Sequence, residues 1–441
     1  MSQDKFSDTK KWFSSLFELY ESSLNGHRSL LSHQLRKGAI ERLDSVDFPT
    51  RKDEDWKYTS VKKLLSYKWR EPEAVEVDFK QIEGFTFPEL KTHRLTFVNG
   101  HLDESLSETR EMPAGVTVTT VDQALEDDEL RPIVERHFKA LAKGSDSAFL
   151  ALNAAFSRSG VFIHVPDGVI VDRPVHLLNL AVSGKEDMMI SPQLFVVVGK
   201  SSELTIIESY RHLPGGKGTY FTNAVNRVVV KANGRLSQLK LQDEDRRAFQ
   251  INNTEAFQDR DSTFTAFTGD LGGQQVRNNL SAFHQGENIL TNLYGIYMAD
   301  GKQHIDNQTF IDHALPHCNS NELYKGIITD RGKGVFNGKV MVRQDAQKTN
   351  AFQQNSTLVL SENGTMDTKP QLEIFADDVR CSHGATIGQL DEKSVFYLRT
   401  RGLTDAQARR LLQKAFIKEV LDFIEIEGFR AEIDRLIEKK F

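Results

Sequence analysis

Cys381 and His383 stand one residue apart in the stretch DDVRCSHGATIG, residues 377–388, and the chain has two cysteines in all. On a β-strand these two side chains point to the same face. A thiolate and an imidazole both bind iron, so the pair is suited to a soft ligand such as sulfide or to iron. Two ligands alone cannot hold a metal, and further ones must come from elsewhere in the chain or from another chain. The residues by themselves favour a buried thiol beside a hydrogen-bonded histidine near a sheet edge.

A second group of possible metal ligands lies in IDHALPHCNS, residues 311–320. His313, His317 and Cys318 are side chains that bind zinc or iron. Pro316 forbids the helix that would place both histidines on one face. Because no CxxC, HExxH or second cysteine is nearby, the sequence favours a loop whose histidines hydrogen-bond to the backbone and whose cysteine packs as a small hydrophobic residue. A self-contained metalloprotein built on these three residues remains an alternative.

Motifs for nucleotide binding and for hydrolysis are imperfect. The stretch GKGVFNGKV, residues 332–340, is similar to a Walker loop but has five residues between Gly332 and Gly338, and Val340 replaces the Ser or Thr that reaches magnesium. The loop PGGKGT has no upstream glycine partner. We therefore expect no ATP binding by this chain alone. No GxSxG nucleophile motif is present.

Neighbouring acidic residues could serve a β-helical enzyme that cleaves polysaccharides, either a hydrolase or a lyase. The candidates are Asp377 with Asp378, and Asp243, Glu244 and Asp245. Adjacent carboxylates on a strand point to opposite faces, however, so surface charge is the ordinary explanation. The enzyme remains an alternative without a convincing carboxylate pair.

Composition is ordinary for a globular protein that does not bind nucleic acid or membranes. The 441 residues are 39% hydrophobic and 27% charged, with a formal net charge of −6. The length predicts two or three domains or one elongated body. The N-terminus has no secretion signal, no apolar run approaches the ~18 residues of a membrane span, and two cysteines make no disulfide framework. We expect a reduced, soluble, cytoplasmic protein.

The first 150 residues predict a mixed, mainly helical domain. Apolar residues recur at three- and four-residue intervals from Trp12 to Leu24 and indicate an amphipathic helix. Residues 48–65 read as a loop leading into a second amphipathic segment. RLTFVNGHL, residues 94–102, predicts a hairpin, and residues 121–138 predict a helix.

Residues 151–402 change character and predict a mainly β core. Short β-branched runs alternate with Gly, Asn and Asp, and no exact internal repeat is visible. A pair of sandwiches and a parallel β-helix both fit. Hairpin turns are few, and HIDNQTFIDH and TNAFQQNSTLVL place amide side chains inside strands, where they could form ladders from coil to coil. The β-helix is therefore favoured.

Residues 403–441 predict a helical C-terminal domain. Thr404 and Gln407 form a capping box, and Leu412, Phe416, Val420 and Phe423 are members of one apolar stripe. We expect Gly428 to end that helix and a second helix to follow. The stripe must bury against the β core or against a partner, and its spacing does not decide between them.

Several long segments resemble the SufD branch of the SufB/SufD family of the bacterial SUF iron–sulfur cluster assembly system. They are FPTRKDEDWKYT, LNAAFSRSGVFIHVPDGV, PHCNSNELYKGIITDRGKGVFNGKVMVRQDAQKT, DTKPQLEIFADDVRCSHGATIGQLDEKSVFYLRTRGL and RGLTDAQARRLLQKAF, and they cover essentially the whole chain in order. SufB members carry a glutamate after the family histidine and a cysteine in a QCD stretch. Here Gly384 follows His383, and Gln354 stands near the cysteine position, as in SufD members.

The resemblance implies a fold and a role. It implies a right-handed parallel β-helix between helical terminal domains, pairing with SufB through the β-helix, or with a second copy of the chain in its absence, and attachment of the ATPase SufC at the C-terminal helices. It implies a non-catalytic scaffold linked to iron acquisition, supplied with sulfur by a cysteine desulfurase system. His383 matches the family histidine at the SufB interface and becomes the expected ligand of iron or of a transient cluster shared with SufB. Cys381 is its expected neighbour, and no tightly bound cofactor is expected in the isolated chain.

Overall fold

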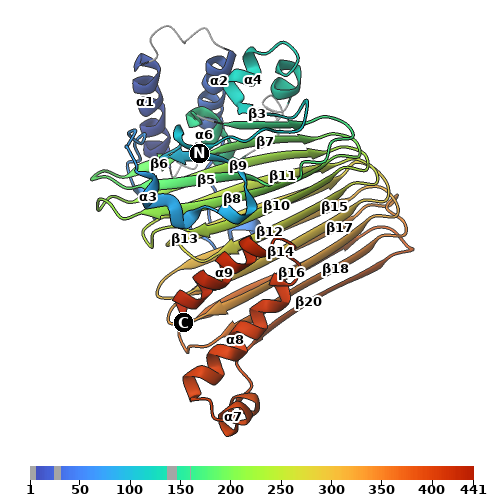
Figure 1. Cartoon of the computed structure of the whole chain (residues 1–441). Helices are drawn as coiled ribbons and strands as arrows, with labels where there is room; N and C mark the ends of the chain where they lie inside the picture. Colours follow the sequence, from blue (N-terminus) through green and yellow to red (C-terminus); the bar gives the residue numbers. More distant parts are fainter. Residues whose placement is uncertain (1–5, 24–30, 137–146, 159) are drawn as a thin grey trace.

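Most of the chain is wound into a β-solenoid in which two parallel sheets run along the length of the molecule (Figure 1). The computed structural model describes residues 6–23, 31–136, 147–158 and 160–441. From residue 193 onward successive strands alternate between the two sheets, so each turn of the coil adds one strand to each. The mainly β fold predicted as a parallel β-helix is therefore confirmed.

Sheet A and sheet B each have ten strands among the described residues. Sheet A contains, in spatial order, β19 (Thr365–Ile374), β17 (Lys333–Val342), β15 (His304–His313), β13 (Gln275–His284), β11 (Phe249–Gln258), β9 (Tyr220–Val230), β7 (Gln193–Val198), β4 (Val161–Val165) and β3 (Thr117–Thr120), with β6 (Met188–Ile190) beside β9. Sheet B contains β2 (His101–Glu108), β1 (His93–Val98), β5 (Val175–Val182), β8 (Glu203–Leu213), β10 (Arg235–Asp243), β12 (Thr263–Asp270), β14 (Leu290–Ala299), β16 (Asn319–Ile328), β18 (Asn350–Val359) and β20 (Arg380–Gly388). The pairs β1–β2 and β3–β4 are antiparallel, and the other ladders are parallel.

The length of one coil varies from turn to turn. In sheet A, Phe249 lies beside Phe221 and Gln275, then Gln275 lies beside His304, and His304 beside Lys333. These steps are 28, 26, 29 and 29 residues. A coil can absorb such differences in its corner loops, which lie on the surface. The variable step explains why the sequence contains no exact repeat.

Amide ladders join neighbouring coils, as the polar residues inside the predicted strands indicated. Asn337 Nδ2 donates to Gln308 Oε1 at 2.8 Å, and Asn350 Nδ2 donates to Asn319 Oδ1 at 3.0 Å. Inside the coil, β-branched and aromatic side chains fill most of the space and form one continuous core along the axis. Backbone pairing on both edges of each strand and this core together hold the solenoid.

Helices cover the N-terminal end of the solenoid (Figure 1). They include α1 (Ser7–Ser23), α2 (Leu31–Ser45) and α6 (Ala148–Phe156). The predicted apolar stripe of the first helix is confirmed by the burial of Phe13, Leu16, Phe17 and Tyr20, whereas Leu24 lies outside the described residues. Trp69 is fully buried in the same cluster, against Phe221 of β9.

Other N-terminal predictions met a mixed outcome. The hairpin is confirmed, with Asn99 and Gly100 at positive φ in the turn between β1 and β2. The helix predicted for residues 121–138 is interrupted: α4 (Val121–Glu126) ends before a turn at 127–130, residues 131–136 are helical again, and Phe138 lies outside the described residues. The loop predicted for residues 48–65 is confirmed, because one-turn helices are its only regular elements, but no amphipathic helix follows directly after it.

The remaining short elements are one-turn helices. They are η2 (Glu54–Trp56), η3 (Leu64–Ser66), α3 (Phe79–Ile82), η4 (Glu83–Phe85) and η5 (Pro88–Leu90). Leu64 and Leu65 are buried although they lie in η3, because this segment packs under α1. Burial there follows tertiary contact and needs no helical period.

Three helices follow the solenoid: α7 (Glu392–Thr400), α8 (Asp405–Leu421) and α9 (Glu427–Lys440). The predicted capping box of Thr404 and Gln407 is confirmed at the start of α8. The prediction that Gly428 ends α8 is wrong. α8 already ends at Leu421, and Gly428 lies in the first turn of α9. Figure 1 shows α8 and α9 lying across sheet B, while α7 projects from the body.

The boundaries predicted at residues 150 and 402 fall near changes of structure. The strands β1 and β2 precede residue 150 and already belong to sheet B, and α7 begins before residue 403. The division into three domains stays a prediction. Within the described residues, no helix combines the length and apolar character needed to cross a membrane.

Candidate functional site at the end of the solenoid

Cys381 and His383 lie on β20, the last strand of sheet B. Within the described residues, β20 pairs with β18 along one edge and with no strand along the other. β19 ends sheet A in the same way, so this end of the coil has no further turn above it (Figure 1). The predicted pair is therefore held on an open sheet edge.

Both side chains belong to the row that faces the inside of the coil. In the ladder Cys381 lies beside Ala351 and His383 beside Gln353, and Ala351 and Gln353 are both buried. Phe352, between them, points outward and is exposed. Because facing is conserved across a parallel ladder, Cys381 and His383 share the inward face, as their spacing predicted.

The thiol and the imidazole differ in their cover. Cys381 is half-buried against a small apolar cluster that includes Val342 and Ala351, whereas His383 is exposed. Burial raises the pKa of the Cys381 thiol, although the backbone N–H of Ala351 partly offsets it. A thiol with a raised pKa is a poor nucleophile at neutral pH unless a cation draws off its proton. The exposed imidazole is the better placed of the two to meet an incoming ligand.

Below His383 the coil interior is polar. Gln353 Nε2 donates to Glu322 Oε2 at 2.6 Å, and both side chains are buried. Burial raises the pKa of Glu322 to about 7 against the hydrogen bond from Gln353, which lowers it. His383 is thus the outermost member of an inward row of polar residues that continues from β16 through β18 to β20.

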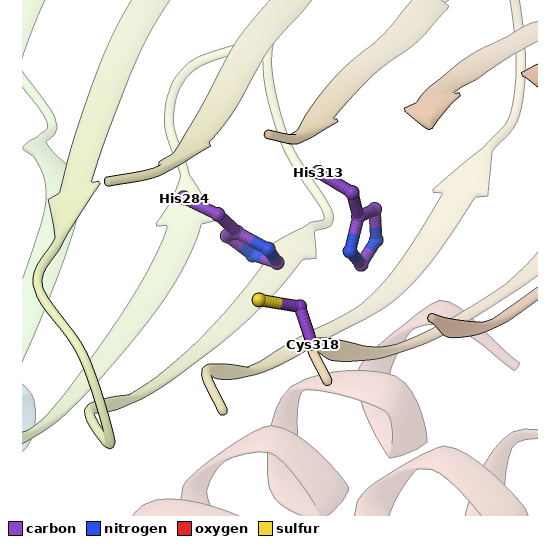
Figure 2. A group of neighbouring side chains, drawn as sticks. All are labelled: His284, His313 and Cys318. Atoms are coloured by element: carbon purple, nitrogen blue, oxygen red, sulfur yellow. The ribbon is translucent and has the colours of Figure 1, made fainter. Parts of the chain in front are cut away.

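A second group of candidate ligands gathers inside one corner of the coil, and Figure 2 shows its three side chains pointing toward one another. It consists of His284, His313 and Cys318, whose ligand atoms all lie within 4.8 Å of one another, and all three residues are buried. The two rings are 4.4 Å apart, edge to face. His317, which the sequence grouped with His313 and Cys318, is instead exposed at positive φ.

Burial controls the charge of this second group. It lowers the pKa of His284 well below its usual value and that of His313 to about 4, so both rings are neutral at neutral pH. It also raises the pKa of the Cys318 thiol. The expectation that these histidines hydrogen-bond to the backbone is wrong for His313, whose Nε2 lies 2.9 Å from Ser320 Oγ.

Sequence reasoning missed His284, and a signal for it exists. His284 precedes His313 by 29 residues, and Thr291 precedes Ser320 by the same step. Each histidine closes a strand of sheet A, and each hydroxyl lies near the start of the next strand of sheet B. A search for this spacing, with the coil length known, would have found the pair.

The acidic candidates do not assemble into a catalytic pair. Asp377 and Asp378 are exposed, and Asp378 forms an ion pair with Lys348. The prediction of ordinary surface charge is wrong for Glu244, which is buried and hydrogen-bonded to Thr222 at 2.7 Å. Burial raises the pKa of Glu244 to about 7.

The Walker-like stretch is part of β17 rather than a loop before a helix. From Lys333 to Val340 its backbone pairs with β15 on one side and β19 on the other. A phosphate-binding loop needs free backbone N–H groups at the start of a helix. The glycines here serve packing instead: a Cβ on Gly338 would lie 2.2 Å from the Gln353 amide nitrogen.

Comparison with protein families matches two models to this chain. The model described as the SufBD core domain of SUF system FeS cluster assembly matches residues 180–416, and the model of the SufBD protein N-terminal region matches residues 7–177. Together they cover nearly the whole chain.

Individual relatives agree with the family models. An iron–sulfur cluster assembly SufBD family protein of Synechocystis is 32% identical over 95% of this chain and 93% of its own length. The iron–sulfur cluster assembly protein SufD of Escherichia coli is 31% identical over 89% of both chains. A chloroplastic protein of Arabidopsis thaliana, ABCI7, is 29% identical over 96% of this chain and 88% of its own.

Proposed function

The chain belongs to the SufBD family of SUF iron–sulfur cluster assembly proteins, and from this premise we propose that it is a non-catalytic, SufD-type scaffold subunit. It pairs with SufB through the open end of the solenoid and with the ATPase SufC through its C-terminal helices. His383 supplies a ligand to iron or to a nascent cluster at the SufB interface, with Cys381 as a second group. The cluster is cargo that passes through the complex.

The placement of Cys381 and His383 on an unpaired terminal strand carries this proposal. Two ligands on one inward face leave at least two positions of a tetrahedral iron site open. A partner that stacks against β19 and β20 would bring its own side chains to the same spot. The site is then completed in trans, which explains why the chain alone holds too few ligands.

Uncovered core residues support pairing at this end. Ile387 of β20 lies beside the buried Thr357 and Ile374 of β19 beside the buried Val342, so both occupy inward positions. Yet Ile387 is 52% exposed, and Ile374 is also exposed. Solenoid ends need a polar cap or a partner to stay soluble, and free strand edges invite strand addition. In the absence of SufB, a second copy of the chain takes its place.

The position of α7 supports SufC attachment, with a change in the residues expected to carry it. The predicted stripe packs back on sheet B only in part: Val420 is buried, whereas Phe423 stacks on Tyr294 and is still 49% exposed. The most exposed large apolar residues of the C-terminal helices lie on α7, where Phe396 is 67% and Tyr397 57% exposed. We propose these two residues as the centre of the SufC contact.

The remaining parts of the proposal concern supply and location. Sulfur reaches the complex from a cysteine desulfurase system that acts upstream, and iron enters at or near His383. Both cysteines are free thiols. Free thiols suit a reducing compartment, and we propose that the protein works in the cytoplasm.

The test is co-expression of the chain with SufB and SufC, followed by anaerobic purification and absorption spectroscopy of the complex. His383→Ala should assemble normally. Its free energy of unfolding should lie within ~0.5 kcal/mol of that of the parent, because removal of an exposed side chain leaves no cavity. Its cluster absorption should fall to a small fraction of that of the parent complex. His317→Ala, also an exposed histidine, is the matched control and should retain the cluster. Full cluster formation by an intact His383→Ala complex would show that the site is wrongly assigned.

A further inference from the structure

The corner group of His284, His313 and Cys318 repeats one arrangement on two successive coils. His284 ends β13 and faces Thr291 of β14, while His313 ends β15 and faces Ser320 of β16. Thr291 and Ser320 are ladder partners. The coil thus places two imidazoles and two hydroxyls in register. Cys318, the residue just before β16, points into the space beside them (Figure 2).

A chain of hydrogen bonds decides which nitrogen of His284 carries the proton. Gln258 Nε2 donates to the Leu290 carbonyl at 3.2 Å, which leaves its Oε1 as an acceptor. Thr291 Oγ1 donates its one proton to that oxygen at 2.6 Å. Thr291 Oγ1 must then accept from His284 Nε2, 2.8 Å away. The Nδ1 atom of His284 is therefore a bare lone pair.

Neither ring has a hydrogen-bond partner at its Nδ1 atom among the described residues, and the Nδ1 atoms of His284 and His313 are both buried. Cys318 Sγ lies 3.5 Å from the Gly286 carbonyl and 3.6 Å from that of Pro316, so the weak S–H donor is directed toward the turns. A buried acceptor without a donor costs roughly 1–3 kcal/mol. The bare Nδ1 of His284 and the unpartnered Nδ1 of His313 lie beside a thiol, and this arrangement requires an explanation.

We propose that His284, His313 and Cys318 form a binding site for one divalent transition-metal ion, with Zn²⁺ as the best-matched ion. Two imidazole nitrogens and a thiolate are ligands that zinc prefers, and they leave one tetrahedral position for a water molecule or a carbonyl oxygen. Binding releases the Cys318 proton to solvent, so the ion is held by one anionic and two neutral ligands. Nε2–H donation to a hydroxyl oxygen is the outer contact that metal-bound histidines make.

The site is separate from the proposed cluster site and does not depend on it. Thr291, Ser320, Ala351 and Cys381 occupy one position on successive strands of sheet B. Cys381 is thus two strand spacings, about 10 Å, beyond Ser320. One ion cannot bind both thiols. An apolar cluster that includes Val342 and Ala351 fills the space between them.

Packing alone is the competing explanation, in which Cys318 acts as a small apolar residue against two rings that meet edge to face. It accounts for the burial and, as His176 with Ser209 shows, for a single buried histidine bonded to a hydroxyl with an unpartnered Nδ1. It does not account for two such rings that converge on a thiol from successive coils. The hydroxyls of Thr291 and Ser320 orient both rings, which an apolar contact would not need. The two explanations differ in one measurable property, the formation of a sulfur–metal bond.

The experiment uses the full chain, treated with a chelator and titrated anaerobically with Co²⁺, whose thiolate complexes absorb in the near ultraviolet. The chain has two cysteines, so Cys381→Ser leaves Cys318 as its only thiol. Cys381 is at an open edge, and this variant is expected to fold. It should develop the thiolate–cobalt band with one equivalent of Co²⁺, and Zn²⁺ should bleach the band.

Three further variants, each made in the Cys381→Ser background, complete the design. Cys318→Ala and His284→Ala, checked for folding by circular dichroism, should lose the band, and His317→Ala should keep it. Zn²⁺ should also raise the melting temperature of the parent chain. Absence of a thiolate–cobalt band in folded Cys381→Ser overturns the proposal. Retention of the full band by folded His284→Ala in the Cys381→Ser background does so as well.

Discussion

Cys318 and Cys381 differ in what surrounds them, and that difference sets what each thiol can do. Cys318 is fully buried beside two neutral imidazoles, while Cys381 is half-buried at an open strand edge. Burial raises the pKa of both thiols, so neither is a free thiolate at neutral pH. A metal ion, which displaces the thiol proton, is the partner that would make either one reactive.

Glu322 leads to a prediction at the residue scale. Its pKa rises from 4.5 to about 7 in the folded chain because of burial. Between pH 4.5 and about 7 the folded state therefore holds a proton that the unfolded chain has lost. The stability that protonated Glu322 contributes to the fold is complete below pH 4.5 and is lost as the pH rises through 7. Glu322→Gln keeps the shape and removes the ionisation. The free energy of unfolding of the variant minus that of the parent should therefore be larger at pH 8 than at pH 4, by up to about 3 kcal/mol.

The measurement is denaturant unfolding of the parent and of Glu322→Gln at both pH values. Glu244, whose pKa also rises to about 7, is present in both proteins, so its effect cancels in the difference. A stability difference between the two proteins that is the same at pH 4 and pH 8 would contradict the predicted pKa.

At the scale of elements, α7 and α8 behave differently although they are neighbours. The C-terminal half of α8 is fixed to the solenoid: Ile417, Val420 and Leu421 pack on sheet B, and Lys325 of β16 pairs with Glu419. In α7, Val395 alone among its nine residues is buried. Arg409 ties α7 to α8 through Glu392 at 2.9 Å. α7 is thus held in place by an ion pair to α8, while most of its surface stays exposed.

This contrast predicts which residues bind SufC. Phe396→Ala with Tyr397→Ala should weaken SufC binding by at least tenfold and leave the melting temperature nearly unchanged, because both rings are exposed. Leu19→Ala, at an equally exposed apolar residue of α1, is the matched control and should bind SufC normally. The measurement is calorimetric titration of SufC into the complex with SufB.

Deletion of residues 404–441 is a cruder test, in which SufC binding should be lost and SufB pairing kept. The deletion also strips the cover from Phe267, Ile296 and Leu323 on sheet B. Loss of binding in the deleted chain would therefore mix two causes. Normal SufC binding by the double alanine variant of α7 would move the contact elsewhere.

At the scale of the whole molecule, the two ends of the solenoid are treated differently. At the N-terminal end, α1, α2 and α6 pack against β6, β9 and β11, and α4 packs against β3 and β4, whereas β19 and β20 end their sheets uncovered within the described residues (Figure 1). The uncovered end displays inward-facing apolar side chains and two free strand edges. Such an end is expected to associate with a second chain.

We predict that the isolated chain forms a dimer through this end. Ile374→Lys with Ile387→Lys should give a folded monomer, because lysine at an uncovered inward position remains solvated while a dimer would bury it. Sedimentation velocity measures the outcome. Ile170→Lys, an exposed isoleucine elsewhere, should leave the dimer intact. A dimer that persists in the double lysine variant would locate the interface elsewhere.

The isolated chain should not bind ATP. Residues 333–340 lie in β17, the second strand from the open end of sheet A, and their backbone pairs with strands on both sides, so no phosphate-binding loop is available at this motif. Calorimetric titration with Mg-ATP should give no heat of binding, with SufC as the positive control. Stoichiometric binding would refute this prediction.

Local patterns in the sequence were enough for the elements whose structure depends on neighbouring residues. The stripe of α1, the Asn99–Gly100 hairpin and the Thr404 capping box follow from side-chain spacing and turn chemistry alone. The coil architecture followed from amides inside strands, since only stacked coils let them form ladders. The shared face of Cys381 and His383 followed from the period of a strand.

Tertiary structure decided everything that depends on which coil lies beside which. His284 joins His313 and Cys318 because one coil takes 29 residues there, and the step varies elsewhere. His317, close in sequence, is turned away by its positive φ. Glu244 is buried, and Val420 in the stripe of α8 is covered, because of surfaces supplied by distant strands. Sequence spacing determines the face on which a side chain lies, whereas coil length and packing determine what it meets there.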